Sequence, residues 1–240
     1  MNVFLAGATG AIGRPSIGIL VARGHRVFAA TRRAERCQRL WDAGAVPVVL
    51  DVLEAAPVAL ALRAVRPDAV LHQLTDLALI ATPGQREESL KRNAHLRKVG
   101  TANLVAAAVS AGVGCCVAQS IAWMYRPGGE PHDEDDPLDL PAPGLRGVTV
   151  EGVVALEDSV LRTPGLCGCV LRYGQLYGPG TLSDHAGTEL PAVHVEAAAW
   201  AAVLALEQQA AGAYNVAEPN GYAQTDKVRR ELGWNESLRA

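Results

Sequence analysis

The stretch Gly7-Ala8-Thr9-Gly10-Ala11-Ile12-Gly13 places three glycines three residues apart near the start of the chain. Residues 2–6 before it are apolar and typical of a strand, and residues 11–23 after it carry apolar side chains at helical spacing. Pro15 falls early in that helix, where its missing N–H is tolerated. The stretch therefore predicts a strand, a tight glycine turn and a helix.

Each of the three glycines has its own physical reason. Gly7 permits the tight turn, Gly10 lets the backbone approach a pyrophosphate, and Gly13 lets the helix pack closely on the strand. The N-terminus of the helix offers free N–H groups and the positive end of its dipole to phosphates. The alternative is a plain strand-turn-helix unit whose glycines serve packing alone. We predict a dinucleotide site with contacts from Gly7, Thr9, Gly10, Ala11, Ile12 and Gly13.

The end of the second predicted strand indicates which dinucleotide is bound. In an NAD site, an Asp or Glu about 20 residues after the glycines holds the ribose 2′-hydroxyl. Here the strand ends in Thr31-Arg32-Arg33, without an acid, and the two arginines would pair with a 2′-phosphate. We therefore predict NADP (NADPH) as the cofactor, with Thr31, Arg32 and Arg33 beside its phosphate. The alternative is two solvated arginines at a helix start.

Strand-like and helical patterns alternate along the whole chain. This rhythm is typical of parallel strands joined by helical crossovers, with helices on both faces of the sheet. We predict an α/β fold with a doubly wound parallel sheet, a Rossmann fold. The predicted strands are residues 2–6, 26–31, 46–50, 69–72, 115–119, 166–172 and 213–216. The predicted helices are residues 11–23, 34–42, 55–65, 85–112, 148–162, 195–209 and 227–232, with a loop at 127–147 and a turn at 177–180.

Composition narrows the class of function. The chain has 240 residues, a net charge of −3 and 49% hydrophobic residues. These values fit a folded domain with a sizeable core and argue against a partner such as nucleic acid or an anionic membrane. The five cysteines show no CxxC spacing, so we predict no metal site and a reduced, cytoplasmic location. No signal peptide or membrane span is expected.

The GxxGxxG spacing, together with later segments, resembles the extended short-chain dehydrogenase/reductase family, which includes the NAD-dependent epimerase/dehydratase proteins. Leu50-Asp51-Val52 resembles the end of the family's third strand, which implies that Asp51 meets the adenine with Val52 beside it. The segment LHQLTD at 71–76 resembles the end of strand four, and LRYGQLYGPG at 171–180 resembles the signature of strand six. The resemblance implies that Leu74 and Thr75 lie beside the riboses, and Tyr173 and Leu176 beside the nicotinamide.

One departure from the family concerns its usual catalytic pair, a Tyr followed four residues later by a Lys. The tyrosine transfers a proton, and the lysine lowers its pKa and holds the nicotinamide ribose. No tyrosine of this chain has a lysine four residues later. When Glu157 anchors the alignment of the relevant helix, Thr149 and Val153 occupy the two positions. A threonine is too weak an acid to replace the phenol.

Two hydroxyls near the end of the fifth predicted strand are candidates for the lost function. Ser120 lies about where the family places a hydroxyl that binds a substrate oxygen, and Tyr125 is the nearest tyrosine in sequence. We predict catalytic roles for both. The alternatives are a turn hydroxyl for Ser120 and a packed aromatic ring for Tyr125.

A second departure is length, because only residues 181–193 fill a place where the family has a long substrate segment. We predict a dinucleotide-binding Rossmann domain over residues 1–175. Residues 176–240 would form a reduced, small substrate-binding portion interleaved with the last strand and helices. The resemblance also implies a homodimer built on the helices at 85–112 and 148–162.

These observations favour an NADP-dependent oxidoreductase or epimerase/dehydratase-like enzyme that acts on a small carbonyl or alcohol substrate. The missing Tyr/Lys pair leaves open whether the chain is an enzyme at all. The alternative is a non-catalytic NADP-binding protein that regulates a partner or senses redox state. A non-redox enzyme on the same scaffold is a third hypothesis, since fold alone does not decide function.

Overall fold

The alternation of strands and helices predicted from the sequence is confirmed in a computed structural model, which describes residues 1–239. The first six strands are β1 (Asn2–Ala6), β2 (Arg26–Thr31), β3 (Val46–Val49), β4 (Ala69–His72), β5 (Cys115–Ile121) and β6 (Cys167–Tyr173). The last three are β7 (Gln175–Tyr177), β8 (Ala192–His194) and β9 (Gly212–Val216). The α-helices are α1 (Gly13–Ala22), α2 (Cys37–Asp42), α3 (Ala55–Val65), α4 (Arg86–His95), α5 (Thr101–Ser110), α6 (Gly144–Leu161), α7 (Val195–Glu207) and α8 (Asp226–Leu232).

Seven strands form one parallel sheet in the order β3-β2-β1-β4-β5-β6-β9. The chain winds outward from β1 to β3 and then returns to place β4 on the other side of β1. Ala6, at the end of β1, is in register with Ala30 of β2 and His72 of β4. In open α/β sheets, ligands bind outside the carboxyl ends of the strands where the winding reverses. That crevice lies here between β1 and β4.

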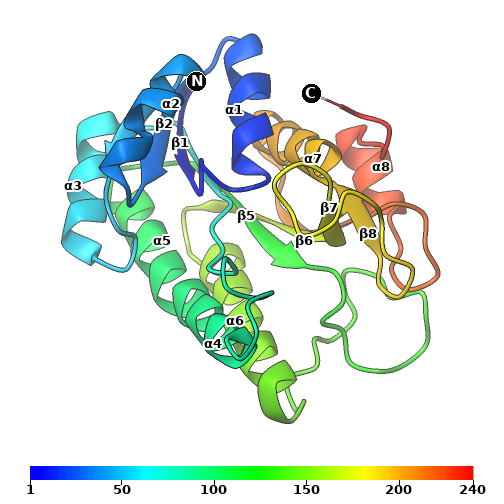
Figure 1. Cartoon of the computed structure of the whole chain (residues 1–240). Helices are drawn as coiled ribbons and strands as arrows, with labels where there is room; N and C mark the ends of the chain where they lie inside the picture. Colours follow the sequence, from blue (N-terminus) through cyan, green and yellow to red (C-terminus); the bar gives the residue numbers. More distant parts are fainter. Residues whose placement is uncertain (240) are drawn as a thin grey trace.

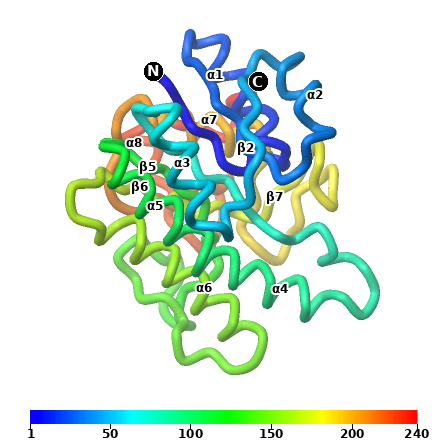
Figure 2. Tube along the Cα trace, turned by 90° about the vertical axis from the view of Figure 1, so that its left-hand side faces the viewer, coloured from blue at the N-terminus to red at the C-terminus, as the bar shows by residue number. Residues whose placement is uncertain are grey.

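Both faces of the sheet are buried, as the apolar runs of the strands predict. Side chains alternate along β1, so that Val3 and Leu5 face one hydrophobic cluster while Phe4 and Ala6 face the other. Figure 1 shows α1 and α7 along one side of the sheet and α3, α5 and α6 along the other. Figure 2 looks onto the side covered by α3 and α5, with α4 and α6 in the lower part of the view.

The structure differs from the sequence prediction at three places. The single helix predicted over residues 85–112 is divided into α4 and α5 by a π-helical turn, η2 (Leu96–Gly100). The helix α6 begins at Gly144, inside the predicted loop, after Pro143 in an extended conformation. Strands β7 and β8 form a small parallel sheet that the sequence analysis missed. Such short strands form through contacts distant in sequence, and local patterns do not report those contacts.

The residues after 175 share the sheet of the first part. The strand β9 pairs with β6, and α7 packs against α1 on the same face. The proposed division into 1–175 and 176–240 stays a prediction. No helix among residues 1–239 combines the length and the apolar character needed to cross a bilayer.

Close packing of α4 on α6 generates a stability prediction. A Cβ added to Gly152 would lie 2.8 Å from Cα of Ala94 on the facing helix, whereas one added to the exposed Gly18 of α1 would meet nothing within 4 Å. We expect Gly152→Ala to lower the free energy of unfolding by about 1–3 kcal/mol. The control Gly18→Ala should raise it by up to about 1 kcal/mol, because alanine favours a helix interior. Urea unfolding midpoints check both values, and equal effects would contradict the close contact.

Candidate functional site

The glycine turn between β1 and α1 brings backbone atoms without side chains to the crevice. Gly7 has a φ of +92°, and a Cβ there would lie 2.3 Å from the carbonyl oxygen of Gln73 at the end of β4. A Cβ on Gly13 would lie 2.2 Å from the carbonyl oxygen of Gly7. Only glycine fits either position. The turn therefore brings the start of α1 against the switch point of the sheet.

The start of α1 has the features of an anion site. No side chain caps the helix N-terminus, and its first turn contains no acidic residue. The orphan N–H groups and the positive end of the helix dipole are thus available to a phosphate at the glycine turn. The backbone cradle and this helix end fit a dinucleotide pyrophosphate.

Arginines surround the end of β2, where the sequence predicts a 2′-phosphate. The side chains of Arg32 and Arg33 are exposed, while Thr31 is buried and its hydroxyl accepts a hydrogen bond of 3.2 Å from the Arg33 N–H. Arg36, which the sequence analysis missed, reaches back to the glycine turn and donates a 2.8 Å hydrogen bond to the Thr9 hydroxyl. A search for cations within five residues of the strand end would have found it.

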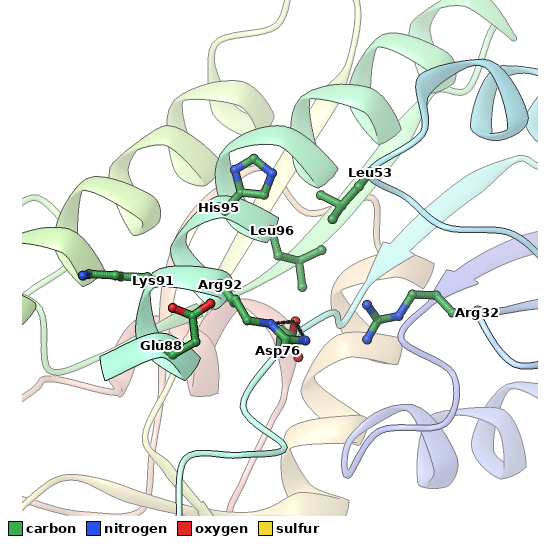
Figure 3. A pocket seen from close by; sticks show the side chains of 8 residues that line it. All are labelled: Arg32, Leu53, Asp76, Glu88, Lys91, Arg92, His95 and Leu96. Atoms are coloured by element: carbon green, nitrogen blue, oxygen red, sulfur yellow. Dashed lines mark hydrogen bonds and ion pairs between the residues drawn. The ribbon is translucent and has the colours of Figure 1, made fainter. Parts of the chain in front are cut away.

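A pocket of about 330 Å³ opens beside this arginine group. In Figure 3, Arg32 extends across it toward the ion pair between Arg92 and Asp76, whose closest atoms lie 2.7 Å apart. Leu53 and Leu96 supply apolar walls. Glu88, Lys91 and His95 complete the lining. An apolar slot rimmed by cations suits an aromatic base attached to a phosphorylated sugar.

The residues that the family resemblance assigns to the adenine and riboses lie near this pocket or the crevice. Asp51 accepts a 3.0 Å hydrogen bond from the N–H of Leu53, which lines the pocket. Val52 is buried, and its carbonyl accepts a bond from the Asn103 side chain. Leu74 follows the end of β4, where its N–H donates to His72 Nδ1 at 3.3 Å. Thr75 is exposed next to it.

The residues assigned to the nicotinamide are placed differently. Tyr173 is only 1% exposed, and its hydroxyl donates a hydrogen bond of 3.1 Å to the Ala198 carbonyl in α7. The Tyr173 side chain therefore packs within the core, and its backbone carbonyl accepts a 2.9 Å hydrogen bond from the Ala122 N–H. Leu176 is half-buried in β7. Cofactor contacts for both residues stay predictions.

The two predicted catalytic hydroxyls, Ser120 and Tyr125, belong to one buried hydrogen-bond network. The Ser120 hydroxyl donates to Glu157 Oε1 at 2.6 Å, and the Tyr125 hydroxyl donates to Asn215 Oδ1 at 2.7 Å. Arg172 donates to the Tyr125 oxygen at 2.9 Å and to Glu157 through Nε and Nη2, at 3.0 and 2.7 Å. The network ties the carboxyl ends of β5, β6 and β9 to α6.

This network argues against Tyr125 as a proton donor. A general acid must hold a proton that can reach the substrate. The only hydroxyl proton of Tyr125 is directed to Asn215, its oxygen accepts a hydrogen bond from Arg172, and burial raises its pKa to about 12. The geometry is that of the packed aromatic ring considered as the alternative from sequence. Ser120, 2% exposed, likewise directs its proton to Glu157.

Glu157, which from sequence only anchored the alignment of the helix, forms an ion pair with Arg172 that was not predicted. Both side chains are nearly fully buried, and a guanidinium held by both oxygens of a carboxylate is a strong, directional pair. Burial alone would lower the pKa of Arg172, but the hydrogen bonds and charge of Glu157 raise it above its usual value. Glu157 lies in α6 and Arg172 in β6, and the local pattern of charged and apolar residues in neither element predicts that the two side chains meet.

The two positions that should carry the usual catalytic pair have neither an acid nor a base. The Thr149 hydroxyl donates to the Leu145 carbonyl within the helix at 2.9 Å, and Val153 is fully buried. Among residues 1–239, no group of three or more His, Cys, Asp and Glu side chains is arranged to hold a metal ion. The hydroxyl protons of Ser120, Tyr125 and Thr149 are therefore all directed to acceptors within the protein.

Comparisons with known proteins agree with this fold. The model of the NAD dependent epimerase/dehydratase family matches residues 3–206. A relative from a Streptomyces species, "3-diazoavenalumate denitrifying reductase", is 43% identical over 239 residues, which covers 91% of this chain and 76% of that protein.

Solved structures are more distant in sequence. UDP-glucose-4-epimerase from Stenotrophomonas maltophila, with bound NAD and formylated UDP-arabinopyranose, has a TM-score of 0.77 at 20% identity and aligns over 100% of this chain and 94% of its own. UDP-N-acetylglucosamine 4-epimerase from Bacillus cereus has a TM-score of 0.76 at 18% identity, with the same coverages. At these identities, the two structures establish the Rossmann fold alone.

The buried histidine at the end of β4 generates a pH prediction. His72 contacts the Thr101 hydroxyl at 2.8 Å, and burial, followed by the charge of Arg97, lowers its pKa to about 4. The unfolded chain has a histidine pKa of about 6.5. Between pH about 6.5 and 4 the unfolded state thus binds a proton that the folded state does not, so stability falls as the pH falls through this window by about 3 kcal/mol. Above pH about 6.5 this contribution is constant.

The variant His72→Gln should remove this part of the pH dependence, since glutamine does not titrate. The control His185→Gln, at an exposed position, should keep it. Chemical unfolding at several pH values between 4 and 8 compares the two with the parent chain. Parallel curves for the parent and His72→Gln would contradict a neutral buried His72.

Proposed function

The chain belongs to the NAD dependent epimerase/dehydratase family, and we propose that it is an NADPH-dependent reductase that replaces the diazo group of a small carboxylate by hydrogen. The family match and a relative whose name is that of a reductase support the oxidoreductase class predicted from the sequence. The carbonyl or alcohol substrate expected there gives way to a diazo compound that reacts as its diazonium cation, because only the cation balances the charge of the hydride. The observation that carries the proposal is the absence of a protein acid at the positions of Thr149 and Val153.

The absence of an acid distinguishes the two kinds of substrate. Hydride addition to a carbonyl carbon develops an alkoxide, and an enzyme acid must protonate it. Hydride addition to a diazonium carbon forms a C–H bond with the hydride's electron pair. The C–N bond then breaks, and its electron pair leaves with N₂. A diazonium cation and a hydride give a C–H bond and N₂ with the charge balanced, so this reaction does not need the proton that the Tyr/Lys pair supplies.

The residues of the glycine turn and the arginines after β2 would bind the cofactor. Gly7, Gly10 and Gly13 let the backbone approach the pyrophosphate at the start of α1. Arg36 would exchange its bond to the Thr9 hydroxyl for the 2′-phosphate, with Arg32 and Arg33 nearby. When bound, NADPH supplies the hydride.

The chain's remaining task is to orient the substrate and keep the site rigid. The pair between Glu157 and Arg172 and the bonds from Ser120 and Tyr125 fix the ends of β5 and β6 in one geometry. Fixed geometry matters because hydride transfer needs close and aligned reacting atoms. Ser120 and Tyr125 thus act as positioning residues in this proposal.

A second candidate is the non-catalytic NADP-binding protein, which the occupied hydroxyls of Ser120 and Tyr125 also favour. It predicts tight NADPH binding without turnover of any diazo compound. The homodimer also stays a prediction. The exposed outer side of α5, with Ala102, Ala106 and Val109, would form part of such an interface.

Cofactor preference is the first test. We expect NADPH to bind more tightly than NADH, and Arg36→Ala to weaken NADPH binding about tenfold to a hundredfold, as the loss of a charge-assisted contact of about 1.5–3 kcal/mol implies. Arg39→Ala, an exposed arginine one turn further on, is the matched control and should bind as the parent chain does. Calorimetric titrations give the four dissociation constants. Equal affinities for the two cofactors in the parent chain would refute the NADP assignment.

Turnover is the second test, with 4-carboxybenzenediazonium as substrate and an enzyme-free control for its spontaneous reaction with NADPH. We expect NADPH consumption with release of one N₂ per cofactor. Tyr125→Phe should lower the melting temperature, because Asn215 and Arg172 lose a partner, yet change kcat by less than about threefold when assayed below the transition. A fall in kcat of about 10²–10⁴-fold, the usual contribution of a general acid, would show that the phenol donates a proton. No turnover with intact NADPH binding would favour the non-catalytic candidate.

A further inference from the structure

Arg97 is a buried cation without a counter-ion. Its side chain lies in the π-helical turn η2 and is 3% exposed. Its Nη1 atom is fully buried without a hydrogen-bond partner, and no carboxylate among residues 1–239 forms an ion pair with it. Arginine is almost never fully buried unless it is paired. This orphan guanidinium therefore needs an explanation.

The π-helical turn accounts for how Arg97 comes to point inward. Leu96, Arg97 and Gly100 are buried, while Lys98 between them is exposed and pairs with Glu151 of α6. A π-helical turn inserts extra backbone into a helix, and such turns are frequent at functional sites. Here the turn directs the charged side chain of Arg97 into the protein. A regular helix at this place could have buried an apolar side chain.

The groups around Arg97 leave one positive charge uncompensated. Glu157 is the acid whose charge acts on Arg97, but its two oxygens already accept hydrogen bonds from Arg172 and Ser120. His72, the other titratable group in this field, is held neutral by burial. Two guanidinium groups thus share one carboxylate. A buried charge without a partner is strongly unfavourable, so an anion from outside the chain would relieve it.

The position of Arg97 favours a substrate anion over a cofactor phosphate. The turn η2 that carries Arg97 directly precedes Thr101, whose hydroxyl contacts His72 at the end of β4, and it packs against α6, which carries Glu157. Ligands of open α/β sheets bind at this edge. The pyrophosphate has its own cradle at Gly7 and the start of α1, and the 2′-phosphate has arginines after β2. Neither requires Arg97.

We propose that Arg97 is the residue that recognises the carboxylate of the substrate. A guanidinium presents parallel N–H donors that match the two oxygens of a carboxylate, and the match is strongest where water is excluded. This inference rests on the proposed function for the identity of the substrate, a diazo-bearing carboxylate. It adds that the enzyme selects its substrate by the acid group, at a distance from the diazo group.

The test compares an acid with its neutral isostere on the full chain saturated with NADP⁺. Calorimetry measures the binding of cinnamate and cinnamamide, neither of which can be reduced by loss of N₂. We expect cinnamate to bind at least tenfold more tightly than cinnamamide, and Arg97→Met to abolish that ratio. Arg97→Lys should restore part of it, because it returns the charge without the fork. Lys98→Met, which removes a neighbouring exposed cation, should keep the ratio of the parent chain.

Thermal unfolding separates recognition from a structural role. If Arg97 lacks a partner, the melting temperature of unliganded Arg97→Met should equal or exceed that of the parent chain, and cinnamate should raise only the parent's. Should Arg97→Met fail to fold, Arg97→Gln and Arg97→Lys carry the comparison. Equal binding of cinnamate and cinnamamide to the parent chain, or an unchanged ratio in Arg97→Met, would overturn the proposal.

The binding test is independent of the proposed reaction. A carboxylate preference that depends on Arg97, without any reduction of diazonium compounds, would support Arg97 and refute the reaction. The opposite result is reduction of 4-carboxybenzenediazonium and of its 4-carbamoyl analogue with equal kcat/KM, in the parent chain and in Arg97→Met alike. It would support the reaction and refute the role of Arg97. If both hold, Arg97→Met should raise KM for the carboxylate substrate and leave its kcat unchanged.

Discussion

The contact of bare backbone at the first glycine turn determines where everything else in the site lies. Gly7 approaches the Gln73 carbonyl and Gly13 approaches the Gly7 carbonyl so closely that a single added carbon would overlap either oxygen. This contact fixes the start of α1 at the crevice between β1 and β4. In the proposed function, the helix dipole, the arginines after β2 and the pocket beside Leu53 bind successive parts of one dinucleotide. A residue with a side chain at either glycine would move the helix away from all of them.

The other half of the site is a layer of buried polar groups at the ends of β4, β5, β6 and β9. In it, Glu157 and Arg172 form an ion pair. Glu157 accepts a hydrogen bond from the Ser120 hydroxyl and Arg172 donates one to the Tyr125 hydroxyl, the two groups predicted from sequence to be catalytic. Buried networks of this kind rigidify a site when every member is satisfied. Among the residues that the structure describes, Nη1 of Arg97 and both side-chain amide atoms of Gln73 in this layer have no hydrogen-bond partner, and of these two residues Arg97 carries the charge. The layer is thus rigid and contains an unpaired positive charge, and the hydroxyl protons of Ser120 and Tyr125 are held by protein acceptors. Those properties suit a reaction that needs orientation and hydride but no acid.

The sequence was sufficient for features that are local. The predicted elements form with the predicted bounds at residues 26–31, 55–65 and 69–72. The glycine spacing correctly predicted the turn between β1 and α1. Features that depend on distant contacts were missed. Arg36 meets Thr9 only because the β2 and β1 ends are neighbours in the sheet, and Glu157 meets Arg172 only because α6 packs over β6. The inward direction of Arg97 follows from a π-helical turn, which has no periodic signal. Tyr125 was placed by its nearness in sequence, whereas its partners Asn215 and Arg172 are remote.

The origin of the hydrogen in the product tests the central claim most directly. The chain would be supplied with NADPH deuterated at the transferred position, and 4-carboxybenzenediazonium would be reduced in ordinary water. Mass spectrometry would then locate the label in the benzoate product. Hydride transfer without a protein acid predicts one deuterium on the carbon that carried the diazo group, and none when unlabelled NADPH is used in deuterium oxide. A product that takes its hydrogen from the solvent would contradict this account.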